Sequence, residues 1–151
     1  IDDGFVLWES NAIVRYLANK HGDGSDIWPN DPQIRASADR WMEWLSTTVA
    51  APMVLVFRNL VRETDETRNM DEVALGTKQA TRLWGMLDQH LAENDFVTGA
   101  TFTIGDIPLG VHARRWIELR PEPAGEMKNL LAWFERLKQR PAYHHCLIPL
   151  Q

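Results

Sequence analysis

A carboxylate and a hydroxyl group stand next to each other near the start of the chain, in Glu9 and Ser10. The apolar run 5–8 before them is typical of a buried strand, and a helical pattern follows to about Lys20 with Ser10 as its expected N-cap. The start of a helix presents unpaired N–H groups and the positive end of its dipole to a ligand. A ligand carboxylate would bind the Ser10 amide and hydroxyl, and a ligand ammonium would pair with Glu9. Together these contacts suit the zwitterion of an α-amino acid.

A simpler interpretation is open for the same residues, in which Ser10 only caps the helix and Glu9 is a solvated charge. The strand at 5–8 also needs neighbours, because each unpaired backbone group in an apolar setting costs about 1 to 3 kcal/mol. No later segment has a clear strand pattern. We therefore expect the sheet to be completed either by residues upstream of Ile1 or by another chain.

Thr103 and Asp106 form a second polar pair, where a new helical pattern begins. With Thr103 as N-cap, Asp106 is the third helical residue and can return a hydrogen bond to the Thr103 amide, which is a capping box. Phe102 and Ile107 are spaced for a hydrophobic staple around it. This register favours a structural role for Asp106 over general acid or base chemistry.

His144, His145 and Cys146 are of types that bind metals, but three successive residues cannot surround one tetrahedral ion without distortion. We therefore expect no metal site. Cys146 is the single cysteine, which excludes an internal disulfide and is typical of a reducing compartment.

The composition limits the kinds of partner. Sixteen Lys and Arg against 21 Asp and Glu give a net charge of -5 with no block of like charge, which disfavours nucleic acid and anionic membranes. No apolar run approaches the roughly 20 residues that cross a bilayer, and no signal segment opens the chain. A cytoplasmic location is expected.

Helical periodicity extends over most of the chain. A glycine-rich polar stretch at 22–32 predicts a linker, and a long helix is expected from 33 to about 64 with a kink at Pro52. Asn69 and Glu72 form a capping pair for a helix that runs to about 92. Apolar residues at steps of three and four predict a buried stripe on this helix, made of Val73, Gly76, Ala80, Leu83, Trp84, Leu87 and Leu91. Further helices are expected over 104–119 and from about 130 to the break at Pro141.

Three stretches, 8–18, 103–106 and 129–143, closely resemble soluble glutathione transferases of the bacterial type. The resemblance implies a mainly α fold, in which the family's C-terminal helical bundle follows the last strand and helix of a thioredoxin-like α/β domain. The implied boundaries are 1–21 for the remnant of the glutathione-binding thioredoxin-like domain, 22–32 for the linker and 33–151 for the all-α domain.

The resemblance also implies roles for single residues. Glu9 and Ser10 would hold the γ-glutamyl end of glutathione, and Thr103 with Asp106 would be a buried capping box that serves folding.

For the pocket of the second, apolar substrate the candidates are Trp44, Thr48 and Met53, with core packing as the alternative for each. Arg115 belongs to a group of arginines at the end of the 104–119 helix, which are either solvated charges or ligands of an anionic second substrate.

The implied activity is the conjugation of the glutathione thiolate to a small electrophile, with glutathione as co-substrate and no other cofactor. In this family a Ser, Tyr or Cys near the first strand activates the thiol, and we expect it upstream of Ile1, so that the chain by itself would bind glutathione weakly and be inactive. A homodimer through the first two long helices is implied as well. Two alternatives are a non-catalytic interaction module and a helical domain with an unrelated small-molecule site.

Overall fold

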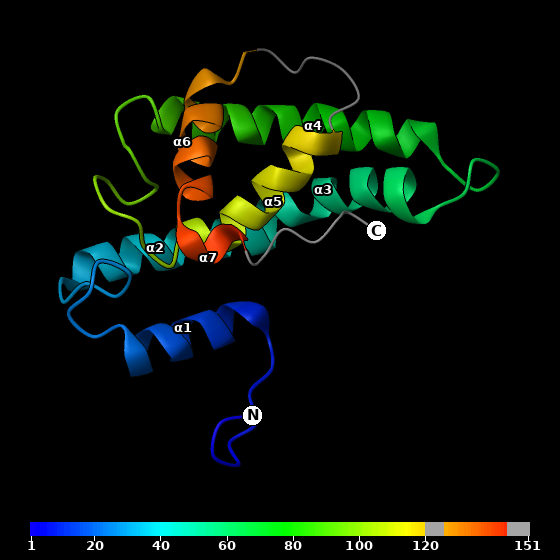
Figure 1. Cartoon of the computed structure of the whole chain (residues 1–151). Helices are drawn as coiled ribbons and strands as arrows, with labels where there is room; N and C mark the ends of the chain where they lie inside the picture. The colour runs from blue at the N-terminus through cyan, green and yellow to red at the C-terminus, as the bar shows by residue number, and fades with distance from the viewer. Residues whose placement is uncertain (120–125, 145–151) are drawn as a thin grey trace.

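The chain folds into helices joined by loops (Figure 1), and the computed structural model describes residues 1–119 and 126–144, the last of these by its backbone alone. The elements in chain order are α1 (Ser10–His21), α2 (Pro32–Trp44), the π-helical turn η1 (Leu45–Val49), α3 (Ala50–Phe57), a second π-helical turn η2 (Arg58–Arg62), α4 (Met70–His90), α5 (Asp106–Leu119), α6 (Lys128–Lys138) and α7 (Pro141–His144). Within these described ranges no strand forms, and only isolated bridges occur. The prediction of a mainly α fold is confirmed.

The strand predicted at 5–8 is not formed. Asp2 and Phe5 make an isolated bridge around a tight turn, and the side chains of Phe5, Val6 and Trp8 are 50%, 65% and 75% exposed. A strand is stable only when neighbouring backbone groups pair with its own, and the described part of the chain offers none for this segment.

The elements from α2 to η2 form one continuous helix of 31 residues. Its start is fixed by Asp31, whose carboxylate accepts a hydrogen bond of 2.8 Å from the Gln33 amide, and by Pro32 in the first helical position. In η1 the Ala50 amide donates to the Leu45 carbonyl, five residues back. This wider turn directly precedes Pro52, so the irregularity predicted at that proline takes the form of a π turn on its N-terminal side.

This long helix is also apolar enough, by length and composition, to cross a membrane, contrary to the expectation from its short apolar runs. The core helix of a globular domain satisfies the same criterion. Met42, Val49, Met53 and Val56 of this helix are 2% exposed or less, and 33% of its most apolar 18-residue window is buried in the protein.

The core lies where the long helix, α4, α5 and α6 meet. In Figure 1, α3 and α4 run side by side in opposite directions, and their close approach depends on Gly76, because a Cβ atom at that position would lie 2.7 Å from the Pro52 carbonyl oxygen. The predicted stripe of α4 is buried here, apart from the half-buried Leu83. The largest fully buried side chains are those of Trp84, Trp116 and Trp133.

The N-terminus of α4 is capped in a way that differs from the prediction. Asn69 Oδ1 accepts hydrogen bonds from the amides of Asp71 and Glu72 at 3.0 and 3.2 Å. The Glu72 carboxylate does not return to the Asn69 amide, which donates instead to Asn59 Oδ1 at 2.8 Å. Glu72 accepts from Asn59 Nδ2, also at 2.8 Å, so the buried Asn59 at the end of the long helix completes the cap.

The start of α6 is capped by a side chain from another helix. Asp88 of α4 accepts hydrogen bonds of 2.8 Å from the amides of Asn129 and Leu130, and one of 3.2 Å from the Asn129 side chain. The carboxylate thereby satisfies two of the unpaired N–H groups of α6 and fixes that helix against α4.

A smaller apolar cluster attaches α1 to the rest of the protein. Ala18 of α1 packs against Ala38 and Met42 of α2 and against Ile104. The linker contributes Trp28, which lies against this cluster with the Arg35 guanidinium 4.7 Å from its ring centroid. The linker tryptophan therefore packs, and it links α1 to the start of the long helix.

Candidate functional site

The turn before α1 has an unusual backbone. Glu9 is the N-cap of α1 and has φ 72° and ψ 116°, a conformation that costs a residue with a side chain on the order of 1 to 3 kcal/mol. Its carbonyl accepts the first helical hydrogen bond, from the Ile13 amide at 2.9 Å. Ser10 is the first helical residue, so the expected N-cap position is wrong by one residue. Strain of this kind persists where the surrounding structure imposes it, often at binding sites.

Among the described residues, neither side chain of this pair has a hydrogen-bond partner. Both residues are exposed, and the helix has no side-chain cap. The unpaired amides at the start of α1, the Ser10 hydroxyl and the Glu9 carboxylate are therefore available to a ligand.

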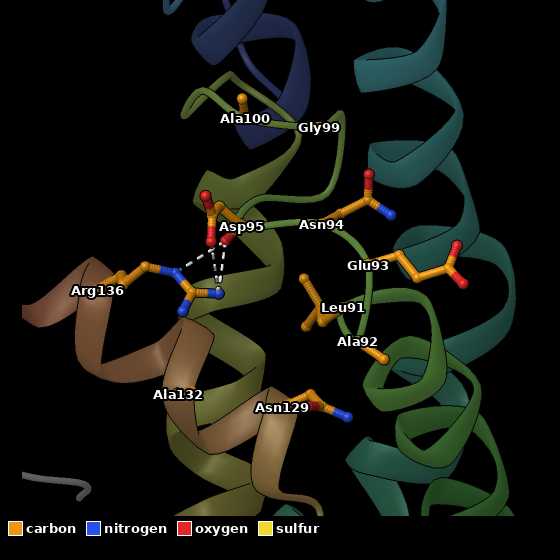
Figure 2. Close-up of a pocket in the computed structure, with 10 residues that line it drawn as sticks. All are labelled: Leu91, Ala92, Glu93, Asn94, Asp95, Gly99, Ala100, Asn129, Ala132 and Arg136. Atoms are coloured by element: carbon orange, nitrogen blue, oxygen red, sulfur yellow. Dashed lines mark hydrogen bonds and ion pairs between the residues drawn. The ribbon is translucent and has the colours of Figure 1, made fainter.

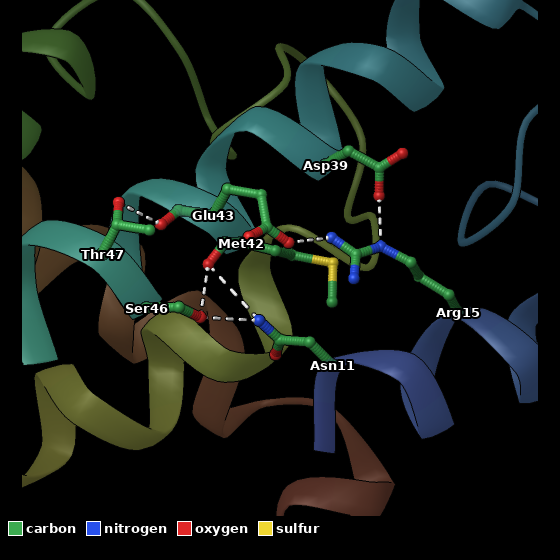
Figure 3. Close-up of polar contacts among 7 residues, drawn as sticks. All are labelled: Asn11, Arg15, Asp39, Met42, Glu43, Ser46 and Thr47. Carbon is green, nitrogen blue, oxygen red and sulfur yellow. Dashed lines mark hydrogen bonds and ion pairs between the residues drawn. The ribbon is translucent and has the colours of Figure 1, made fainter. Parts of the chain in front are cut away.

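Polar contacts from α1 to the long helix fix the direction of this turn (Figure 3). Asn11 donates hydrogen bonds to Ser46 Oγ at 2.9 Å and to the Met42 carbonyl at 3.4 Å. Arg15, one turn further on, lies between Asp39 at 2.6 Å and Glu43 at 2.5 Å. The start of α1 is thereby held against η1.

These contacts also affect the charge state of Arg15. Partial burial lowers the pKa of the Arg15 guanidinium, but its hydrogen bonds to Asp39 and Glu43 outweigh that effect and raise the pKa above its ordinary value. Arg15 is therefore a permanent cation between two carboxylates, which makes this contact directional.

The segment before the turn folds back onto α1. Asp2 accepts hydrogen bonds from Tyr16 Oη at 2.7 Å and from Lys20 Nζ at 2.5 Å, and the Phe5 and Tyr16 rings lie 5.4 Å apart. The hydrogen bonds from Lys20 and Tyr16 lower the pKa of Asp2. This contact keeps the N-terminal segment on α1.

The four residues predicted for a second-substrate pocket lie in different environments. Thr48 is exposed on η1, and Trp44 is half-buried with its ring edge-on to Trp41. Asn11 contacts Met42 and Ser46 of the same helix, and neither Trp44 nor Thr48 is among its partners. Met53 is 2% exposed, and its sulfur accepts a hydrogen bond of 3.4 Å from Trp84 Nε1 in the core, so the core-packing alternative describes it.

Arg115, the fourth of these residues, lies elsewhere on the protein. Its guanidinium carbon is 4.7 Å from the ring centroid of Phe57, near the end of the long helix. The structure therefore does not bring these four residues together: Trp44 packs on Trp41, Thr48 is exposed, Met53 is in the core and Arg115 lies against Phe57.

Asp106 is fully buried and accepts hydrogen bonds from three N–H groups. The Thr103 amide donates at 2.9 Å, as the capping box predicted, and the Thr103 hydroxyl lies 3.4 Å away. The Val97 amide at 3.0 Å and Trp133 Nε1 at 2.9 Å complete the set. The reciprocal half of the box is absent, because the Asp106 amide donates to the Thr103 carbonyl and not to its hydroxyl.

Burial raises the pKa of Asp106 above its ordinary value, and the hydrogen bonds from Thr103, Val97 and Trp133 oppose this shift. The carboxylate has no exposed surface, so a substrate has no access to it. The sequence predicted Thr103 as a hydrogen-bond partner of Asp106, whereas the hydrogen bonds from the Val97 amide and the Trp133 indole are seen only in the folded structure.

A polar pocket of about 450 Å³ lies where the loop after α4 meets α6 (Figure 2). Arg136 in its wall donates hydrogen bonds of 3.0 and 2.8 Å to the Asp95 carbonyl. Neither Glu9 nor Ser10 lines this pocket.

Among the described residues no group of three His, Cys, Asp or Glu side chains is arranged to hold a metal ion. The sequence predicted that His144, His145 and Cys146 do not form a metal site, and the side chains of these three residues lie outside the part of the chain that the structure describes.

Comparison with known proteins identifies the family. Over 145 residues the chain is 32% identical to glutathione S-transferase GstB of Escherichia coli K12, which covers 93% of this chain and 67% of GstB. This chain belongs to the glutathione S-transferase family. No family model matches it.

Solved structures of glutathione S-transferases are similar to this chain as well. The apo structure of the theta class enzyme from Xanthomonas axonopodis pv. citri has a TM-score of 0.92 and 38% identity, covering all of this chain and 80% of that one. A second structure of the same enzyme, with glutathione bound, has a TM-score of 0.93 at 38% identity and covers 99% of this chain and 72% of that one. By family, therefore, the protein is a transferase with a mainly helical fold.

Proposed function

We propose that the protein conjugates the thiolate of glutathione to a small electrophile, and that the start of α1 binds the γ-glutamyl end of glutathione. Glutathione is then a co-substrate, and its sulfur forms a bond to an electrophilic carbon while the leaving group departs with its electron pair. The observation that carries the proposal is that Glu9 and Ser10, at a helix N-terminus with a strained backbone, have side chains without a hydrogen-bond partner in the described part of the chain.

The chemistry of the γ-glutamyl group matches this turn. Its α-carboxylate would accept hydrogen bonds from the Ser10 amide and hydroxyl, near the positive end of the α1 dipole. Its α-ammonium would pair with the Glu9 carboxylate. The positive φ of Glu9 supports the assignment, because strain at an exposed turn without an internal partner is typical of a binding site.

The second substrate is proposed to lie against the long helix near Trp44, at the end of α2, and Thr48, on η1, the turn whose Ser46 accepts a hydrogen bond from Asn11. A homodimer through the long helix and α4 is proposed as well. Exposed apolar side chains on these two elements support it, with Val54 at 57%, Leu75 at 50% and Met86 at 53% exposed. Light scattering that gave the mass of a single chain would contradict the dimer.

The site is tested by retention on immobilised glutathione and by calorimetric titration with glutathione. Ser10→Ala is expected to weaken binding about tenfold to a hundredfold, since hydrogen bonds to charged groups contribute about 1.5 to 3 kcal/mol. Glu9→Gln should weaken it similarly by removing the partner of the ammonium.

Ser37→Ala provides a matched control, because it removes a serine hydroxyl from α2 whose partner is the Arg40 side chain at 3.1 Å. This variant should bind as the unmodified protein does. If binding survives in a protein that lacks both the Glu9 and the Ser10 side chains, the assignment of the site is wrong.

A further inference from the structure

An apolar pocket of about 230 Å³ lies between the linker, α5 and the segment from the end of α6 to α7. The apolar residues that line it from these segments include Ile27, Phe102, Ile107, Val111, Leu137 and Tyr143. For comparison, an engineered apolar cavity of about 150 Å³ takes a benzene ring. The apolar pocket therefore has room for an aromatic ring that carries a short chain.

Arg140 lies at the boundary between this apolar pocket and a more open hollow beside it, because it lines both, as do Ile27 and Phe102. The guanidinium carbon of Arg140 is 3.7 Å from the ring centroid of Phe102, so the cation is stacked on the ring. The N–H donors of a guanidinium group lie in its plane, and stacking leaves them available to an acceptor.

The Arg140 guanidinium is not neutralised by a carboxylate of the protein. Over the ranges 1–119 and 126–144 it makes no ion pair and no side-chain hydrogen bond. Arg136, one turn earlier, differs in this respect, because it donates to the Asp95 carbonyl. An exposed cation beside an apolar pocket is complementary to a ligand that has a carboxylate and an apolar body.

Two carboxylates of the protein limit the charge of such a ligand. Asp106 lines the apolar pocket, but its side chain is fully buried and accepts hydrogen bonds from three N–H groups, so it presents no surface to a ligand. Asp26 lines the open hollow and is exposed. Its negative charge would repel a second charge on the ligand, which favours a monocarboxylate over a dicarboxylate or a phosphate.

Ile27 connects the apolar pocket to α1. Its side chain packs against the cluster around Ala18 that attaches α1 to the protein. A Cβ atom at Gly22, the C-cap of α1, would lie only 2.9 Å from Ile27 Cγ2, so Ile27 also contacts the end of the helix. A ligand that packs on Ile27 therefore supports the helix whose start carries Glu9 and Ser10.

We propose that the apolar pocket binds a monocarboxylic acid with an apolar body, that its carboxylate binds Arg140, and that the bound acid strengthens glutathione binding at the start of α1. The acid is a regulatory ligand and not a substrate, since Glu9 and Ser10 line neither the pocket nor the hollow. Both ligands bind the arrangement in which α1 is in place, so each should tighten the binding of the other by the same factor. The coupling rests on the proposed function, whereas the binding of the acid does not.

The site is tested by calorimetric titration with 4-phenylbutyrate, with 4-phenylbutyramide as the neutral compound of similar shape. At low ionic strength the acid should bind the unmodified chain at least about tenfold more tightly than the amide, and Arg140→Gln should remove this preference. Arg40→Gln is the matched control. It removes an exposed arginine that lies 5.9 Å from the Trp41 ring centroid and lines neither the pocket nor the hollow, and it should keep the preference.

A second variant tests where the carbon body lies. Val111 is 49% exposed, so Val111→Asp should be tolerated by the fold, and its carboxylate beside the apolar body should weaken binding of the acid at least about tenfold. Equal binding of acid and amide to the unmodified chain, or a preference that Arg140→Gln keeps, overturns the site. Binding that Val111→Asp leaves unchanged overturns it as well.

The coupling is tested by titration with glutathione, with and without saturating 4-phenylbutyrate. The acid should lower the Kd for glutathione at least about threefold in the unmodified chain and leave it unchanged in Arg140→Gln. A Kd that the acid leaves unchanged or raises in the unmodified chain overturns the regulatory role. A chain that binds the acid through Arg140 but does not bind glutathione supports the acid site and counts against the proposed function.

Discussion

Replacement of Asp106 by alanine is expected to destabilise the protein much more than the loss of an ordinary helix cap. A cap residue contributes about 0.5 to 2 kcal/mol, and the capping box alone predicts about 1 to 2 kcal/mol for this change. In the structure the carboxylate accepts from the Thr103 and Val97 amides and from the Trp133 indole, at 2.9 to 3.0 Å, and has no exposed surface.

In the alanine variant these three N–H groups lose their acceptor inside the protein. Each buried, unpaired donor costs about 1 to 3 kcal/mol, whereas removal of a buried charge returns part of its desolvation cost. The free energy of unfolding should therefore fall by about 3 to 5 kcal/mol. Equilibrium unfolding in urea, followed by circular dichroism, measures it.

The control for this prediction is Trp133→Phe, which keeps an aromatic ring and removes one donor to Asp106. It should cost about 1 kcal/mol, and in a double-mutant cycle the two changes should be strongly non-additive because they share one hydrogen bond. A loss below about 1 kcal/mol for Asp106→Ala would refute the reasoning. So would a variant of unchanged stability that had lost only its activity.

Two further predictions concern α4 and α5. Gly76→Ala should destabilise the protein by roughly 1 to 3 kcal/mol, because the new Cβ atom would lie 2.7 Å from the Pro52 carbonyl oxygen. Gly85→Ala, whose Cβ atom would meet nothing within 4 Å, should stabilise α4 by up to about 1 kcal/mol. Unfolding in urea that showed changes of the same sign for both variants would contradict this prediction. The pKa of His112 is held below 6.5 in the folded protein, so the unfolded state binds a proton first as the pH falls. The contribution of His112 to the free energy of unfolding should be complete above about pH 6.5 and decrease below it, and His112→Gln should remove this dependence of stability on pH. An NMR titration that placed the His112 pKa at or above 6.5 would exclude this explanation.

The helices could be predicted from the spacing of apolar residues because each buries one stripe. In α4 the positions predicted to be buried include Val73, Ala80, Trp84 and Leu87, and all four are. The hydrogen bond from the Thr103 amide to the Asp106 carboxylate could also be predicted, since the two residues are only three positions apart. Local signals of this kind depend on neighbouring positions and therefore appear in the sequence.

Contacts between residues that are distant in the sequence could not be predicted in this way. Asp88 caps α6 from a position 41 residues before Asn129, and neither residue has a local pattern that indicates the other. Asn59 follows Arg58 near the end of the long helix, and only the packing of α4 shows that it completes the cap at Asn69. Such pairs follow from tertiary structure and need the fold to be known.

The candidate site was predicted in its residue types but not in its backbone. Glu9 and Ser10 were identified by their chemistry and by the start of the helical pattern. The left-handed φ of Glu9, and the shift of Ser10 into the first helical position, have no signal in the sequence, because glutamate rarely adopts that conformation.

The way α1 is attached has a consequence for how the protein opens. The main core holds the long helix, α4, α5 and α6 together, whereas α1 is attached through Ala18 and its neighbours and through the ion pairs of Arg15. Segments with few buried apolar contacts open at a lower free energy than the core does. The amides of α1 should therefore exchange with solvent through a local opening that leaves α4 protected, and added salt should make that opening more frequent. The helix that carries the proposed glutathione site is thus expected to open as a separate unit, and ligand binding at its start would slow its exchange selectively.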